Sequence, residues 1–297
     1  VSKHPNETEK FKHIFKIALT YPLYSKVENY PLARSAKSDS NGNLEVDDYF
    51  YKHREQIALD NDSLMYFYAY RNYVLNHMYN RVNALGYDIN SNEFTIHLLK
   101  SISSELNDEN SKNSMLRKTF IRHFYWNSSK SINKKTVDTF LKCNTNSTDK
   151  NLILNLTSDT EKVNEGALLD DFYITDYNKT QRSVKRLIKN KNTVLYFWNP
   201  KYIGKDFIAS RIQYLSEKYP NLKFIGVKIN GDNKDRIYKL DIKSQYYLES
   251  SSKANIFLTS QIPRTILINK KGIVTNSFAS LSSRNIFNQI DQLAKTK

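Results

Sequence analysis

Residues 193–207 read Thr193-Val-Leu-Tyr-Phe-Trp198, followed by Asn199-Pro-Lys-Tyr-Ile-Gly-Lys-Asp-Phe207. The first six residues form an almost continuous apolar run, which is typical of a strand that is covered on both faces of its sheet. A helix is predicted over 206–219, because its apolar residues recur every three or four positions. This stretch therefore predicts a buried strand that leads through a short loop into a helix.

Strands and helices alternate through the rest of the C-terminal half, which indicates an α/β sheet. Pro263 stands directly before a predicted hairpin, where a residue without an N–H is expected, and its peptide bond is a candidate for the cis form. The glycine that ends Lys270-Lys271-Gly272 favours a two-residue primed turn. The predicted strands cover 172–175, 193–198, 222–229, 264–269 and 273–279, and the predicted helices cover 183–189, 206–219, 234–240, 245–249 and a last segment after Ser282 or Ser283.

The N-terminal half has a helical period instead. Apolar residues recur at spacings of three and four in helices predicted over 63–86 and around 11–18, 94–106 and 116–124. Residues 35–42 are small and polar and are predicted to form a loop. We therefore expect two domains, a helical domain over residues 1–155 and an α/β domain over residues 156–297.

The composition is basic and poor in cysteine. The 297 residues include 45 Lys and Arg against 30 Asp and Glu, for a formal net charge of +15, and one cysteine, Cys143. A charge of this size is found in proteins that bind nucleic acid. Here the cations are spread along an Asn-, Tyr- and Ile-rich chain, so we interpret the charge as a compositional bias and expect no nucleic-acid partner. One cysteine excludes an intramolecular disulfide.

Several classes of site and segment are not expected. No apolar run approaches the ~18 residues of a membrane span, so no transmembrane segment is predicted. The chain opens at Val1 without a Met or an apolar leader, which indicates a processed N-terminus. Export therefore stays open, as does a lipid anchor outside residues 1–297. The histidines lack ligand spacing, and no phosphate loop or nucleophile elbow occurs, so we predict no metal and no cofactor.

Four segments carry a resemblance to the thioredoxin-like superfamily, most closely to its TlpA-like thiol:disulfide oxidoreductase branch of the bacterial envelope. The resemblance covers residues 164–295, and it implies a thioredoxin fold and a periplasmic or outer-membrane-associated location. The helical half resembles the accessory domain that precedes such modules in Bacteroidetes proteins. The four segments are Gly166-Ala-Leu-Leu-Asp-Asp-Phe-Tyr-Ile-Thr-Asp-Tyr-Asn-Lys-Thr180, Val194-Leu-Tyr-Phe-Trp198, Leu222 to Asn230, and Gln261-Ile-Pro-Arg-Thr-Ile-Leu-Ile-Asn-Lys-Lys-Gly-Ile-Val274.

The chain departs from this family at the reactive site. The family's reaction implies a low-pKa thiolate at the start of the helix after strand 193–198, and a second cysteine that resolves the mixed disulfide. Tyr202 and Lys205 occupy these two positions. A phenol and an ammonium group do not perform disulfide exchange. We therefore predict a degenerate active site without thiol oxidoreductase activity.

The groove beside these positions is the candidate binding site. In thioredoxins the cis-proline loop and the active-site rim bind extended peptide by backbone pairing. The resemblance implies that Trp198, Tyr202, Lys205, Ile262 and Pro263 line the corresponding surface. The leading hypothesis is a redox-inactive module of the bacterial cell envelope that binds a protein or peptide or assists assembly.

Three other interpretations stay open. An enzyme with non-thiol chemistry in this groove requires a buried ionisable cluster around Tyr202 and Lys205. A basic adaptor for an anionic polymer requires one contiguous positive face. Alternatively, the two side chains fill a solvated rim and have no further role.

Overall fold

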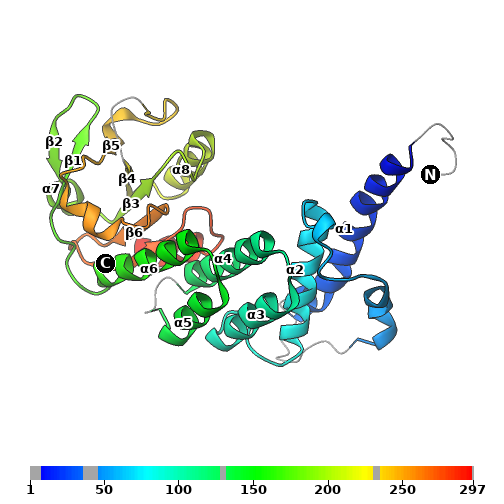
Figure 1. Cartoon of the computed structure of the whole chain (residues 1–297). Helices are drawn as coiled ribbons and strands as arrows, with labels where there is room; N and C mark the ends of the chain where they lie inside the picture. Colours follow the sequence, from blue (N-terminus) through cyan, green and yellow to red (C-terminus); the bar gives the residue numbers. More distant parts are fainter. Residues whose placement is uncertain (1–7, 36–45, 128–131, 230–234, 296–297) are drawn as a thin grey trace. The chain divides into compact units, whose positions relative to one another are not determined.

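The computed structural model describes residues 8–35, 46–127, 132–229 and 235–295 (Figure 1). The contacts divide the chain into two compact units, of which unit 1 comprises residues 1–123 and 133–150 and unit 2 comprises residues 124–132 and 151–297. Helix α6 (Ser147–Glu161) runs through residue 155. The domain boundary predicted there stays a prediction.

Unit 1 is helical, as its apolar period predicted. Helix α1 packs along α2, and α3 packs against α2 and α5. The opening helix is much longer than residues 11–18, because it continues through Pro22 and Pro31. Most of the predicted loop at 35–42 lies outside the described residues. The helices before the first strand are α1 (Glu9–Ser35), α2 (Tyr68–Asn83), α3 (Asn92–Glu105), α4 (Glu109–Trp126), α5 (Lys134–Cys143) and α6, with 3₁₀ helices η1 (Asp48–Gln56) and η2 (Asp62–Leu64). The last residues of α4 and most of α6 belong to unit 2.

Unit 2 contains a seven-stranded mixed sheet in the order β2-β1-β5-β4-β3-β6-β7. The central strand β3 pairs with β4 in parallel and with β6 in antiparallel orientation, and β6 pairs with β7 in antiparallel orientation. The strands are β1 (Tyr173–Asp176), β2 (Gln181–Ser183), β3 (Thr193–Trp198), β4 (Lys223–Lys228), β5 (Gln245–Tyr247), β6 (Arg264–Ile268) and β7 (Val274–Ala279); the helices are α7 (Val184–Ile188), α8 (Lys205–Lys218), α9 (Ile286–Lys295), η3 (Ile242–Ser244) and η4 (Lys253–Phe257).

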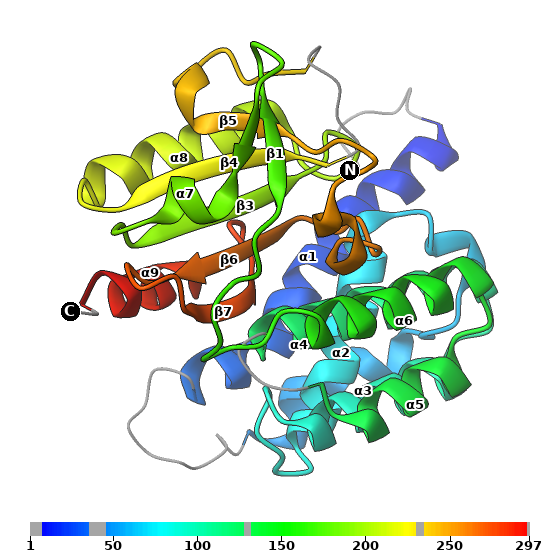
Figure 2. The ribbon, with the colours of Figure 1, turned by 90° about the vertical axis from the view of Figure 1, so that its left-hand side faces the viewer.

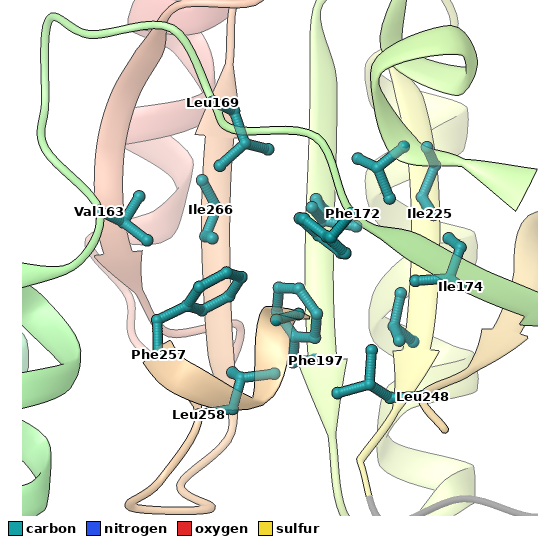
Figure 3. Close-up of a cluster of buried hydrophobic side chains, with 14 of the residues drawn as sticks. Val163, Leu169, Phe172, Ile174, Phe197, Ile225, Leu248, Phe257, Leu258 and Ile266 are labelled. Carbon is teal, nitrogen blue, oxygen red and sulfur yellow. The ribbon is translucent and has the colours of Figure 1, made fainter. Parts of the chain in front are cut away.

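Strand β3 supplies side chains to two hydrophobic clusters, one on each face of the sheet. Tyr196 and Trp198 pack in the cluster that includes residues of α8 and α9, whereas Leu195 and Phe197 pack in the cluster that includes residues of α7 and η4. Figure 2 shows α7 and α8 on opposite faces of the sheet, and Figure 3 shows Phe197 within the second cluster. Successive side chains of a strand point to opposite faces, so a strand with both faces covered must be apolar throughout. The central position of β3 therefore explains its apolar run.

Three local predictions for unit 2 were wrong. Residues 245–249 were predicted to be helical, but they begin with β5, which is held by pairing with β4 and β1. Residues 235–240 form no helix. The hairpin turn has three residues rather than two, because the main-chain N–H of Gly272 bonds to the carbonyl of Asn269, and only the glycine adopts a positive φ, of 83°. A type I turn that ends in a left-handed glycine has this form.

Candidate functional site

The loop between β3 and α8 is a tight turn built on Asn199. Its side-chain Oδ1 accepts a bond from the Lys201 N–H at 2.9 Å, and its carbonyl accepts bonds from the N–H groups of Tyr202 and Ile203 at 2.9 and 3.1 Å. Asn199 itself is buried. The turn presents Tyr202 just before the helix, with half of its side chain exposed, and α8 begins at Lys205.

A pocket of about 380 Å³ lies in unit 2 beside this turn. Most of its lining is aromatic or aliphatic, and it includes Trp198, Tyr202 and Pro263 of the five predicted groove residues. Lys205 and Ile262 are not part of the lining. The remaining lining residues are Tyr125, Phe197, Ile203, Gly204, Phe207, Ile208, Thr265, Ser280, Leu281 and Ser282.

Lys205 forms an ion pair with Asp235. Its Nζ lies 2.9 Å from Asp235 Oδ1, and the Nζ of the buried Lys228 lies 3.1 Å from Asp235 Oδ2. Hydrogen bonds from Lys205 and Lys228 lower the pKa of the Asp235 carboxyl. The position of the resolving cysteine therefore carries a partly exposed ion pair instead of a group that lines the pocket. Sequence reasoning missed Asp235, which has no pattern that links it to Lys205.

The carbonyl of Pro263 is already bonded within unit 2. The Tyr125 hydroxyl donates to it at 2.8 Å, and Tyr125 also lines the pocket. Burial raises the pKa of this phenol, so it stays a donor. The peptide bond before Pro263 is trans, since the described residues contain no cis peptide bond, and the candidate cis form is thus not found. Tyr125 lies 138 residues away in sequence, and no local signal identifies it.

The loop that precedes Pro263 is fixed by two buried charged side chains, Asp159 and Arg264. The Asp159 carboxylate accepts four hydrogen bonds from the main chain and hydroxyls of Thr259 and Ser260. Arg264 donates to the carbonyls of Asp159, Phe257 and Ser277. Gln261, between these two anchors, has a φ of 55°, which is uncommon for a residue other than glycine.

The described ranges contain no group of three or more His, Cys, Asp or Glu side chains that could hold a metal. Cys143 is a free thiol on α5 of unit 1. Neither Tyr202 nor Lys205 is buried, so these two positions do not form the buried ionisable cluster that an alternative enzyme chemistry requires. Within the same described ranges, none of the helices combines the length and the apolar character needed to cross a bilayer.

No protein-family model matches the chain, and no curated protein matches it. Among solved structures, it is similar to the thioredoxin domain of a thiol-disulfide oxidoreductase from Bacteroides vulgatus, with 18% identity and a TM-score of 0.35 over 45% of this chain and 99% of that chain. It is also similar to a thiol:disulfide interchange protein from Bacteroides sp., with 18% identity and a TM-score of 0.35 over 45% of this chain and 92% of that chain.

Likeness at this level carries no information about the reaction, and the fold is assigned from the strands of unit 2 themselves. The order β4-β3-β6-β7, with one parallel pair followed by two antiparallel pairs, a helix between β3 and β4 and a helix after β7, is the thioredoxin-like arrangement. The fold predicted from the sequence resemblance is confirmed for unit 2: it is a thioredoxin-like sheet that follows a helical N-terminal region.

Proposed function

We propose that this chain is a redox-inactive thioredoxin-like protein of the bacterial cell envelope, which binds a protein or an extended peptide in the groove beside Tyr202 and Pro263. The observation that carries the proposal is the pocket at the start of α8. It keeps an apolar lining, while a phenol and an ion-paired ammonium stand where thiols are required for disulfide exchange. The envelope location rests on the sequence resemblance.

The chemistry of the lining favours an apolar side chain as the bound group. Trp198, Phe207 and Ile203 make much of the lining aromatic or aliphatic, and Tyr202 and Ser282 are lining residues that carry hydroxyls. Pockets of this kind bury an apolar group and use a small number of polar atoms to orient it. An extended segment with one large aliphatic or aromatic side chain meets these requirements.

The protein is expected to show no turnover above background in a dithiothreitol-driven insulin reduction assay, because neither required thiol is present. The double variant Tyr202→Cys/Lys205→Cys is the positive control, since it places two cysteines at the family's spacing on the same helix start. Robust turnover by the unmodified protein would falsify the redox-inactive assignment.

The variant Phe207→Glu is expected to weaken peptide binding at least about ten-fold, because a carboxylate in an apolar pocket must be desolvated by the bound group. The measurement is fluorescence anisotropy with dye-labelled, reduced and carboxymethylated α-lactalbumin as a permanently unfolded probe. Tyr214→Glu is the matched control, because Tyr214 is a similarly exposed aromatic residue of α8 that does not line the pocket. Equal losses in both variants, or none in either, would move the binding site away from this groove.

A further inference from the structure

Helix α1 carries a band of exposed apolar side chains on one face. Four of its large hydrophobic side chains between residues 11 and 23 share this face and are 41–60% exposed. The rings of Phe11 and Phe15 stack on each other, with centroids 5.9 Å apart. We call this surface the α1 band, and its members are Phe11, Phe15, Leu19 and Leu23.

The α1 band faces away from the side of α1 that packs within unit 1. Ile17, Ser25, Glu28 and Pro31 are buried positions of the helix, and α1 packs against α2. Phe11, Phe15, Leu19 and Leu23 follow one another at intervals of four residues, so they form one stripe along the helix. At 1.5 Å per residue this stripe is about 18 Å long. Single exposed apolar side chains are common on protein surfaces, but a contiguous apolar stripe of this length is not.

Cations border the α1 band. Lys16 and Lys26 are exposed and stand three residues before Leu19 and three residues after Leu23, so they lie at the edges of the stripe. Residues 9–35 contain five Lys and Arg and only two acidic residues. Of these two, Glu28 is fully buried and Glu9 is paired with Lys12 at 2.8 Å. An apolar stripe bordered by lysines, with little accessible negative charge, is complementary to an anionic surface that has an apolar interior.

We propose that α1 lies on an anionic phospholipid membrane, with the α1 band in the interface between head groups and acyl chains. Phe and Leu on one face and Lys beside them are the residues with which amphipathic helices bind such surfaces. The lysines add attraction to acidic lipids within about one Debye length of the membrane. A second copy of the chain is a poorer occupant, because two such bands would bring like charges together.

The test is flotation of the full chain with lipid vesicles on a density gradient. The protein is expected to float with phosphatidylcholine vesicles that contain about 30% phosphatidylglycerol and to float far less with pure phosphatidylcholine, and salt of about 0.5 M is expected to reduce the difference. Phe15→Ser/Leu19→Ser should lower the affinity for the acidic vesicles at least about ten-fold, because two apolar side chains are lost. Lys16→Gln/Lys26→Gln should lower the same affinity about five-fold per lysine.

The matched control is Tyr66→Ser/Tyr238→Ser, which removes two highly exposed aromatic side chains outside α1 and is expected to leave vesicle binding unchanged. Circular dichroism checks that each variant is folded. The proposal is overturned if the protein floats with neither vesicle, if it floats equally with both, or if the control lowers binding as much as Phe15→Ser/Leu19→Ser does. A second copy of the chain is the alternative occupant of the α1 band. If the protein does not bind vesicles, and sedimentation velocity shows a dimer that Phe15→Ser/Leu19→Ser dissociates, the band is a dimer interface and the proposal is overturned.

Discussion

Replacement of Asp159 by alanine is expected to lower the free energy of unfolding of unit 2 by about 3–5 kcal/mol. The Asp159 carboxylate is fully buried. It accepts bonds from the N–H and Oγ1 of Thr259 at 2.8 and 2.7 Å, and from the N–H and Oγ of Ser260 at 2.9 and 2.6 Å. Alanine leaves the buried N–H and hydroxyl of Ser260 without this acceptor, and each such loss costs about 1–3 kcal/mol, whereas the part-buried donors of Thr259 lose less.

Arg264 adds to this cost. Burial lowers the pKa of its guanidinium, and the nearby charge of Asp159 acts in the opposite direction. Removal of the Asp159 carboxylate therefore takes a negative charge away from the buried guanidinium of Arg264. The main-chain carbonyls of residue 159 and Phe257 still accept hydrogen bonds from this guanidinium at 3.0 and 2.6 Å. Loss of a nearby opposite charge destabilises a buried cation for this reason.

The two tryptophans make the measurement specific to unit 2. Trp126 and Trp198 are the only tryptophans of the chain and both belong to this unit, so their fluorescence during urea unfolding reports on it. The exposed Asp170 serves as the control, because its replacement by alanine should change the unfolding free energy by less than about 0.5 kcal/mol. A loss below about 1 kcal/mol for Asp159→Ala would show that the loop before Pro263 is held by other contacts.

The elements that could be predicted from the sequence are those with a strong local pattern. Strand β3 has the predicted bounds because its position at the centre of the sheet favours an almost continuous apolar run. Strand β5 was predicted to be helical, because its three residues form a strand only through pairing with β4 and β1. Helix α1 continues beyond its predicted end, through two prolines, because packing along α2 outweighs their low helical propensity.

In the candidate site, too, only the residues next to a strong local pattern could be located from the sequence. Tyr202 and Lys205 could be located because the strand and the helix start on either side of them have clear patterns. Asp159 and Arg264 could not be linked, because the contacts that join them cross about a hundred residues of sequence. Tyr125 lies in a helix whose apolar period explains its burial without any reference to Pro263. Polar contacts between distant segments produce no periodic pattern in the sequence. The sequence therefore predicts the strand and the helix start beside the groove, but not the hydrogen bonds that fix the loop before Pro263.

Replacement of Glu28 by alanine is expected to destabilise unit 1 by about 3–5 kcal/mol. Its carboxylate is fully buried and accepts five hydrogen bonds, from Nε and Nη2 of Arg54 at 2.9 and 2.6 Å, Nδ2 of Asn80 at 2.8 Å, and the rings of His53 and His77 at 3.1 Å each. Alanine removes this acceptor from all four side chains, and of the four Asn80 keeps a second one in the Tyr51 hydroxyl at 3.0 Å. Hydrogen exchange of peptides from α1 and α2 measures this loss, and tryptophan fluorescence of unit 2 serves as the internal reference.

Glu28 and the side chains bonded to it form a buried polar cluster, and their pKa shifts predict how the stability of unit 1 depends on pH. Burial alone would raise the pKa of Glu28, but the hydrogen bonds from Arg54, His77 and Asn80 outweigh it and hold the pKa well below its usual range. A carboxyl whose folded pKa is depressed contributes stability above its unfolded pKa, near 4.3, and this stability is lost as the pH falls further. Burial also lowers the pKa of His53, so protonation below about pH 6.5 favours the unfolded state in the same direction.

The conservative variant Glu28→Gln separates these two contributions, because it removes the carboxyl but retains its shape. The difference in stability between the unmodified protein and Glu28→Gln should be largest above about pH 5 and should shrink below about pH 4, where the unfolded carboxyl binds a proton. The neighbouring exposed Glu55 provides the control, since Glu55→Gln should leave the pH profile of exchange in α1 and α2 unchanged. A difference that stays constant from pH 7 to about pH 3 would mean that the ionised state of Glu28 does not stabilise the fold, and that the cluster is held by its shape and its neutral hydrogen bonds.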